Sequence, residues 1–189
     1  MGGNVVLGYA GVRRQRIRRL VNLEGFGLPD GAPTAAPQRL AQWLDELRTP
    51  QRLKPYASLA EVAQRLQQNN PRIAAPLAQW LARHWAAPQP DGQWVLQADA
   101  AHKRVNPVLN RAAEAVALWS AITAPLLWVQ GRASTPERHW AGRYSQAEFQ
   151  QRLVHVPDLR KAWLEDAGHM LHHDQPAALA ALLDDFLRP

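Results

Sequence analysis

Three short apolar runs, separated along the chain by helix patterns, constrain the fold most. The first run is LVNL, which is followed by Glu24 and then Gly25. The second run is PLLWVQ, which ends at Gly131, and the third is RLVHV. Runs of this length bounded by turn residues are typical of buried strands. Strands that alternate with helices indicate a parallel sheet with helices on both faces. We therefore predict an α/β fold with strands around residues 20–24, 125–130 and 152–156.

The two ends of the chain read as helices of that fold. The opening segment MGGNVVLGYAG is small and apolar, with glycines at 2, 3, 8 and 11. Glycine at this frequency is typical of a helix packed tightly against a sheet. The closing segment PAALAALLDDFLRP has the Ala/Leu spacing of an amphipathic helix, with a proline at its start.

Between the first and second runs the sequence changes character and becomes rich in Pro, Gln and Ala. Helix patterns occupy residues 36–48, 58–69 and 75–85, and a short ribbon is predicted near residues 93–98. A further helix is expected in NPVLNRAAEAVALWSAI, with Pro107 near its first turn. We expect this block to be a helical insertion above the carboxyl ends of the strands, where α/β folds place their sites. The predicted division is residues 1–30, a helical cap at 31–115, and residues 116–189.

Composition limits the classes of function. The 189 residues include no cysteine, so disulfides and thiolate chemistry are excluded. Neither a secretory signal pattern nor an apolar stretch of membrane-spanning length is present, which predicts a cytoplasmic protein without a membrane partner. The net charge is +6, and its densest cluster is the arginine run at positions 13, 14, 16, 18 and 19. This run lies between a helix and a strand without aromatic stacking residues, so we favour a solvated connection over nucleic-acid binding.

The strongest local signal for chemistry is the segment EDAGHMLHHDQP before the final helix. His169 follows Gly168 in a turn after a strand, which would expose the imidazole at the carboxyl edge of the sheet, close to a nucleophile on another strand. An isolated histidine in such a turn is more often an ordinary surface residue. The segments around it change that balance.

Three segments resemble the α/β-hydrolase superfamily, in the order that the superfamily has them. MGGNVVLGYAG is similar to the segment that begins after the nucleophile in the pattern Gly-x-Ser-Met-Gly-Gly, VNLEGFG to the sixth strand, and WSAITAPLLWVQG to the seventh. The resemblance implies an esterase-like serine hydrolase with His169 as catalytic base, a helical cap, a small apolar ester as substrate and no cofactor. A non-catalytic interaction module, using the arginine run and the helical cap, is the alternative.

The same resemblance sets an expectation for the start of the chain. The nucleophilic serine would lie one position before Met1, and the backbone N–H of Met1 would stand at an oxyanion-hole position. Gly2 and Gly3 would occupy the crowded turn between strand and helix. We expect a chain of this extent to be inactive alone and to self-associate through the exposed strand at residues 20–24.

The resemblance leaves the acid of the triad open. Many relatives place an Asp after the seventh strand, but this chain has Ser134 at that point, and a hydroxyl cannot hold an imidazolium by charge. Other members place the acid after the sixth strand, where this chain has Glu24. We favour Glu24 over Glu137 or Asp166.

Two further groups of residues have weaker functional interpretations. His169, His172 and His173 have the spacing of metal ligands, but no carboxylate or cysteine completes the set convincingly, so no metal is predicted. Four tryptophans of the predicted cap are expected to pack its core, although some could line an apolar acyl pocket. These are Trp43, Trp80, Trp85 and Trp94.

Overall fold

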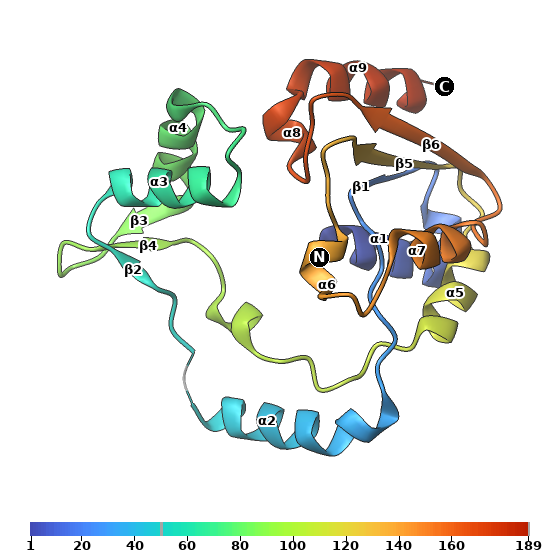
Figure 1. Ribbon diagram of the computed structural model, residues 1–189, viewed down its shortest axis with the longest axis horizontal. Helices are drawn as coiled ribbons and strands as arrows, with labels where there is room; N and C mark the ends of the chain where they lie inside the picture. The colour runs from blue at the N-terminus through green and yellow to red at the C-terminus, as the bar shows by residue number, and fades with distance from the viewer. Residues whose placement is uncertain (50, 189) are drawn as a thin grey trace. The chain divides into compact units, whose positions relative to one another are not determined.

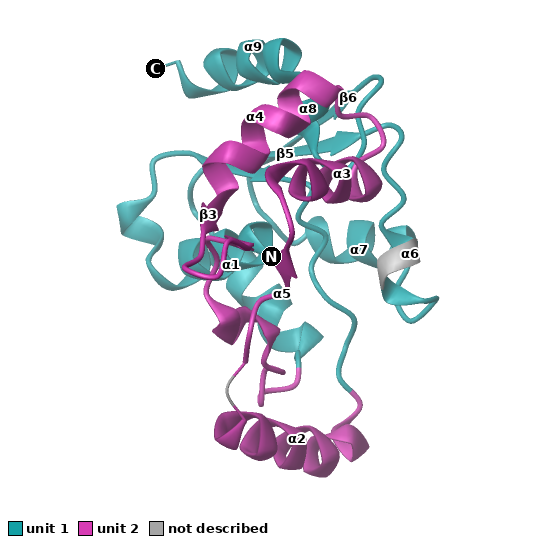
Figure 2. Ribbon diagram, turned by 90° about the vertical axis from the view of Figure 1, so that its left-hand side faces the viewer, with its two compact units in different colours: residues 1–31, 110–189 teal, residues 32–109 magenta. Residues whose placement is uncertain are grey.

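The computed structural model describes residues 1–49 and 51–188, with the side chains of residues 138 and 139 left out. The chain divides into two compact units (Figure 2). The core unit consists of residues 1–31 and 110–189, and the helical unit of residues 32–109. In the part of the chain that the structure describes, no helix combines the length and apolar character that crossing a bilayer requires.

The core unit is built on a parallel sheet of three strands in the order β1-β5-β6. The strands are β1 (Leu20–Leu23), β5 (Leu126–Gly131) and β6 (Leu159–Leu164). Leu20 pairs with Leu126, which in turn pairs with Leu159, so the three strands run in register from the same end. The first four residues of the central strand are apolar and buried, as expected for a strand that is covered on both faces. The predicted α/β fold is confirmed.

Helices cover both faces of this sheet (Figure 1). One face packs against α1 (Gly2–Val12), α5 (Ala112–Ser120) and α7 (Gln146–Leu153), and the other against α8 (Leu171–Asp174) and α9 (Pro176–Leu187). Alternate side chains of β5 serve the two faces, since a strand turns successive residues to opposite sides. Trp128 therefore joins the first core and Val129 the second, both fully buried.

The third strand lies later in the chain than the sequence pattern predicted. Residues 146–153 form α7, whose start is fixed by a reciprocal capping box between Ser145 and Glu148. Phe149 and Leu153 lie one helical turn apart on α7 and are fully buried against the core. The prediction of a strand at residues 152–156 is therefore wrong, and β6 is the third strand.

Close packing of α1 explains two of its glycines. A Cβ on Gly3 would lie 2.6 Å from both Asn22 Oδ1 and the Cα of Gly25, and a Cβ on Gly11 would collide with the carbonyl of Leu118. The predicted tight packing of this helix is thus found at Gly3 and Gly11 but not at Gly8, where a Cβ would meet no other described segment within 4 Å. Gly2 is different, because outside its own helix and its chain neighbours no described atom lies within 4 Å of where its Cβ would be. The crowded strand-to-helix turn expected at Gly2 stays a prediction.

The helical unit contains the three helices predicted from the sequence. They are α2 (Ala36–Arg48), α3 (Leu59–Asn69) and α4 (Ala75–Trp85). The predicted ribbon is the middle strand of a small antiparallel sheet, β2 (Pro55–Tyr56), β4 (Trp94–Leu96) and β3 (Ala86–Pro88). Short turns of tighter helix occur at Arg14–Arg16, Pro33–Ala35 and Ala100–Lys103, and α6 spans Glu137–Trp140.

Helix α5 begins five residues after Pro107, later than predicted. The Asn106 side chain accepts a hydrogen bond from the Val108 N–H, 3.0 Å away, which makes a local turn that competes with helix. The helix begins at Ala112, whose N–H donates to Asp30 Oδ1 at 2.7 Å. A carboxylate from another segment therefore satisfies one of the free amides of the first turn.

Candidate active site

The ends of the three parallel strands place Glu24, Ser134 and His169 at one edge of the sheet. Glu24 directly follows β1, Ser134 lies three residues after the end of β5, and His169 lies in the turn between β6 and α8. Carboxyl ends of parallel strands meet at a common edge, so residues far apart in the sequence become neighbours there. The three side chains form a hydrogen-bonded cluster, which we call the edge cluster.

Glu24 is the buried centre of the edge cluster, with only 4% of its surface exposed. Its Oε1 accepts the Gly131 N–H at 2.6 Å, and its Oε2 accepts the Ser134 hydroxyl at 2.5 Å. His169 Nδ1 lies 3.2 Å from the same Oε2. A buried carboxylate is costly unless hydrogen bonds replace water, and these contacts do so. The backbone of Glu24 has a left-handed φ of 55°, which is uncommon for a residue with a side chain.

The contact with Glu24 favours one arrangement of the His169 ring. An ionised carboxylate only accepts hydrogen bonds, so the tautomer that fits this contact has its donor at Nδ1 and its acceptor at Nε2. The side chain of His169 is 54% exposed, whereas that of Glu24 is 1% exposed. The pair therefore joins a buried carboxyl group to an imidazole that is half exposed.

The turn that carries His169 is held from two sides. The Gly168 N–H donates to Asp174 Oδ2 at 2.7 Å, and the Ala133 N–H donates to the Ala167 carbonyl at 2.9 Å. A Cβ on Gly131 would collide with that carbonyl, so the turns after β5 and β6 approach so closely that only glycine fits. His169 thus stands on a backbone fixed relative to Gly131.

The other acids considered from the sequence lie elsewhere in the core unit. Glu137 Oε1 accepts the N–H of Gln146 at 3.0 Å, at the start of α7. Asp166 lies in the turn between β6 and His169 with a left-handed φ of 51°. The carboxylate that the structure pairs with His169 Nδ1 is that of Glu24. Its role as the acid of a triad stays a prediction.

Met1 is the N-terminal cap of α1 and is 81% exposed. Its carbonyl accepts the N–H of Asn4 at 3.0 Å. The first turn of α1 lies beside the residue after Glu24, because Gly3 and Gly25 are in close backbone contact. The oxyanion-hole position of Met1 stays a prediction.

His172 and His173 lie on α8, with ring centroids 4.1 Å apart. Burial and the charge of His172 lower the pKa of His173, against the opposing charge of Asp174. Among the side chains that the structure describes, no group of three His, Asp or Glu residues is arranged to hold a metal ion.

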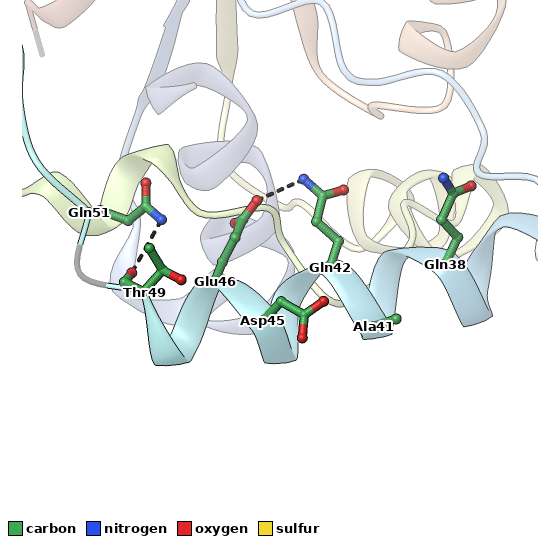
Figure 3. A pocket seen from close by; sticks show the side chains of 7 residues that line it. All are labelled: Gln38, Ala41, Gln42, Asp45, Glu46, Thr49 and Gln51. Carbon is green, nitrogen blue, oxygen red and sulfur yellow. Dashed lines mark hydrogen bonds between the residues drawn. The ribbon is translucent and has the colours of Figure 1, made fainter.

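A hollow of about 520 Å³ lies along one helix of the helical unit (Figure 3). It is lined by α2 and the residues just after it, namely Gln38, Ala41, Gln42, Asp45, Glu46, Thr49 and Gln51. These side chains are mostly amides and carboxylates, and no histidine is among the described residues that line the hollow. We assign it no role in the chemistry of Glu24 and His169.

Only one of the four tryptophans expected to pack the helical unit packs against its buried core. Trp94 contacts that core, whereas Trp80 and Trp85 are 56% and 39% exposed, and Trp43 is partly exposed. For Trp80 and Trp85 the expectation of core packing is wrong.

Three polar contacts around the Glu24 turn are not evident from the sequence. Ser134 holds Glu24 directly, and the indole N–H of Trp128 donates to the Gly25 carbonyl at 3.2 Å. Asn22, fully buried in β1, accepts the Gly25 N–H at 2.9 Å. The signal that could have found Asn22 is a lone amide inside an apolar strand, since a buried polar group needs a partner.

Comparisons with known proteins agree with this geometry. The sequence model of the alpha/beta hydrolase family matches residues 1–182. None of the curated proteins compared matches the sequence. Among solved structures, a thioesterase domain from the curacin biosynthetic pathway is similar, with a TM-score of 0.78 and 24% identity.

Two further structures are similar. A hypothetical protein from Pseudomonas aeruginosa PAO1 has a TM-score of 0.77 and 24% identity, and an esterase from M. tuberculosis has 0.67 and 19%. The alignment with the thioesterase domain covers 97% of this chain and 63% of that domain. The alignment with the Pseudomonas protein covers 96% and 62%, and the alignment with the esterase covers 98% and 59%. The chain therefore spans about three fifths of the length of these proteins. With a family match over nearly its whole length and an edge cluster at the carboxyl ends of a parallel sheet, the chain belongs to the alpha/beta hydrolase family.

Proposed function

We propose that this chain supplies the acid and the base of an esterase-like hydrolase, with His169 as general base and Glu24 as the carboxylate that orients it. The observation that carries the proposal is the 3.2 Å contact between His169 Nδ1 and the buried Glu24 Oε2. That contact leaves Nε2 as the accepting nitrogen, in the tautomer that can take a proton from a nucleophile. The similarity to a thioesterase domain and an esterase supports the same chemistry.

We assign the nucleophile to a serine directly preceding Met1, as in the pattern Gly-x-Ser-Met-Gly-Gly. The serine oxygen attacks the ester carbonyl carbon while His169 Nε2 takes the hydroxyl proton. The tetrahedral oxyanion collapses, the bond to the leaving group breaks, and His169 returns the proton to that group. Water then repeats the sequence on the acyl-serine and releases the carboxylic acid. With Met1 inside a longer chain, its N–H would donate to the oxyanion.

The substrate class that we propose is small carboxylic esters with an apolar acyl group, and related thioesters. Apolar pockets discriminate weakly between acyl chains that differ by one or two methylenes, so a graded preference is expected. The reaction as written uses only the serine, His169, Glu24 and water.

An assay of short-chain aryl esters tests the proposal. Two proteins are compared: the 189-residue chain and the extended chain, in which the residues encoded directly upstream of Met1 precede it. The extended chain should hydrolyse the esters, and its His169→Ala variant should lose about 10⁴-fold or more in kcat, because the base of a triad is essential to the unit. His172→Ala, which changes an exposed histidine three residues away, is the matched control and should keep its turnover.

Two outcomes would overturn parts of the proposal. Full activity of the extended His169→Ala variant would remove the base assignment. Equal turnover by the 189-residue chain and the extended chain would place the nucleophile within residues 1–189, and the serine assignment would be wrong.

A further inference from the structure

We propose that Ser134 is a positioning residue of the edge cluster, whose hydroxyl holds the Glu24 carboxylate in the orientation that His169 needs. This inference rests on the proposed function and deepens it. Its basis is that Ser134 and His169 use the same carboxylate oxygen: the Ser134 hydroxyl is 2.5 Å from Glu24 Oε2, and His169 Nδ1 is 3.2 Å from it.

The two oxygens of Glu24 are held by different groups. Oε1 is fixed to the backbone by the Gly131 N–H, at 2.6 Å. A single fixed oxygen leaves the carboxylate free to turn about its last bond, because terminal torsions of this type are broad. The Ser134 hydroxyl supplies the second anchor, on Oε2, and the two bonds together fix the plane of the carboxylate.

The Ser134 hydroxyl is itself well placed to act as an anchor. The Ser134 N–H donates to the Gly131 carbonyl at 3.0 Å, so residues 131–134 form a closed turn. That turn also contributes the Gly131 N–H, so both anchors of Glu24 come from one short segment, the last residue of β5 and the turn that follows it. The segment is held to the turn carrying His169 by the hydrogen bond between Ala133 and Ala167.

This arrangement gives Ser134 a task that differs from that of a triad acid. A hydroxyl carries no charge to stabilise the imidazolium, and Glu24 supplies that charge. The Ser134 hydroxyl donates a hydrogen bond to a carboxylate, and hydrogen bonds to charged groups are among the stronger ones in proteins. Loss of the hydroxyl should therefore affect the turnover step, in which the ring becomes charged, more than substrate binding.

Kinetics of the extended chain test this role. Ser134→Ala should lower kcat about tenfold or more while KM changes less than about twofold, a loss of the size expected for a hydrogen bond to a charged group. Ser134→Thr keeps a hydroxyl at this position and should restore most of the turnover. Thr135→Ala removes the neighbouring hydroxyl, on an exposed residue, and is the matched control that should leave kcat unchanged.

A spectroscopic readout in the 189-residue chain tests the same role without turnover. The proton on His169 Nδ1, directed at Glu24, should exchange slowly with water in the unmodified chain, as observed by proton NMR of ¹⁵N-labelled protein. Ser134→Ala should accelerate this exchange, and Ser134→Thr should not. If Ser134→Ala fails to fold, Ser134→Cys preserves the volume with a much weaker donor and should show the same acceleration.

The outcomes separate this inference from the proposed function. Unchanged kcat and unchanged Nδ1 proton exchange in Ser134→Ala, with an inactive His169→Ala variant, would overturn the role of Ser134 alone. An active His169→Ala variant would overturn the proposed function, and the exchange measurement would then decide whether Ser134 orients Glu24. Equal loss of kcat in Ser134→Ala and Ser134→Thr would also overturn the role of the hydroxyl.

Discussion

Asn22 connects the turn after Glu24 to the first turn of α1. It is fully buried, and its Nδ2 lies 3.5 Å from the carbonyl oxygens of both Gly3 and Gly25, to which it donates. Its Oδ1 accepts the Gly25 N–H at 2.9 Å. One amide side chain therefore satisfies backbone groups on two segments that must lie in contact for the edge cluster to form.

Replacement of Asn22 by Ala should destabilise the core unit. The buried Gly25 N–H would lose its acceptor, and the Gly3 and Gly25 carbonyls would each lose a donor, although the Gly25 carbonyl keeps the indole N–H of Trp128. An unsatisfied buried group carries a desolvation cost. We expect the free energy of unfolding of the 189-residue chain to fall by about 2–3 kcal/mol in urea titrations. Asn110→Ala is the control: its amide also donates to carbonyls of the 24–31 segment, but the residue is partly exposed, so the loss should be below about 1 kcal/mol. Equal losses in both variants would contradict this account.

At the residue scale, a residue's place after a strand predicts its membership of the site better than its residue type does. Glu24 can be singled out because it follows an apolar run that ends in a turn, and His169 because it follows Gly168 in a turn before the last helices, although the strand before it was misplaced. The structure places the two side chains in contact. From the sequence, Ser134 is notable only because it stands where many relatives have an Asp. The sequence does not reveal that Glu24 Oε2 lies within reach of the Ser134 hydroxyl. Contacts between residues 110 positions apart depend on strand order, which a sequence pattern does not encode.

Helix α2 shows how one side chain fixes an element to an irregular segment of the helical unit. Glu46 Oε2 accepts the Val105 N–H at 2.7 Å, and Oε1 accepts the Gln42 amide at 2.7 Å. The Val105 hydrogen bond, the Gln42 hydrogen bond and the charge of Arg104 lower the pKa of Glu46 below its ordinary value of 4.5. The folded state therefore favours the charged form of this carboxyl group.

This shift predicts a pH dependence of stability. Because the folded pKa is the lower one, the contribution of Glu46 to stability is complete above pH 4.5 and is lost as the pH falls through the folded pKa. Carbon NMR of the Glu46 carboxyl should show a midpoint below 4.5. In unfolding measurements between about pH 5 and pH 3, the usual acid range of carboxylates, Glu46→Gln should lose less stability than the unmodified chain. Glu114→Gln, on an exposed position of α5, is the control; the same slope in all three proteins would refute the prediction.

At the element scale, the misplaced third strand has a physical explanation. Strand β6 lies at the edge of the sheet in the order β1-β5-β6, so only one side of it pairs. Its sequence, LRKAWL, contains an arginine and a lysine and therefore does not resemble a buried strand. In the structure Arg160 pairs with Asp185 of α9, and Lys161 contacts Gln150 of α7. Edge strands tolerate such charged residues. Strand β1 is the other outer strand of this sheet, and both β1 and β5 were predicted correctly because no charged residue interrupts their runs.

At the scale of the whole molecule, the edge cluster depends on a sheet that brings distant segments together. Glu24 and His169 are 145 positions apart, and the helical unit at residues 32–109 is inserted between them in the sequence. The alternation of strands and helices was enough to predict a parallel sheet and a common edge for both residues. It could not predict which acid the strand order would bring to His169, because Glu24, Glu137 and Asp166 all follow strands in the chain.

The measurement that tests the central claim most directly is a double-mutant cycle on kcat/KM of the extended chain. If Glu24 acts through His169, Glu24→Gln should lose about 10³- to 10⁴-fold, and His169→Ala about 10⁴-fold or more. The variant carrying both changes should then be about as active as His169→Ala alone, because residues that act as a unit are not additive. Losses that multiply in the double variant, or a Glu24→Gln variant with undiminished kcat/KM, would contradict the pairing of Glu24 and His169 as one catalytic unit.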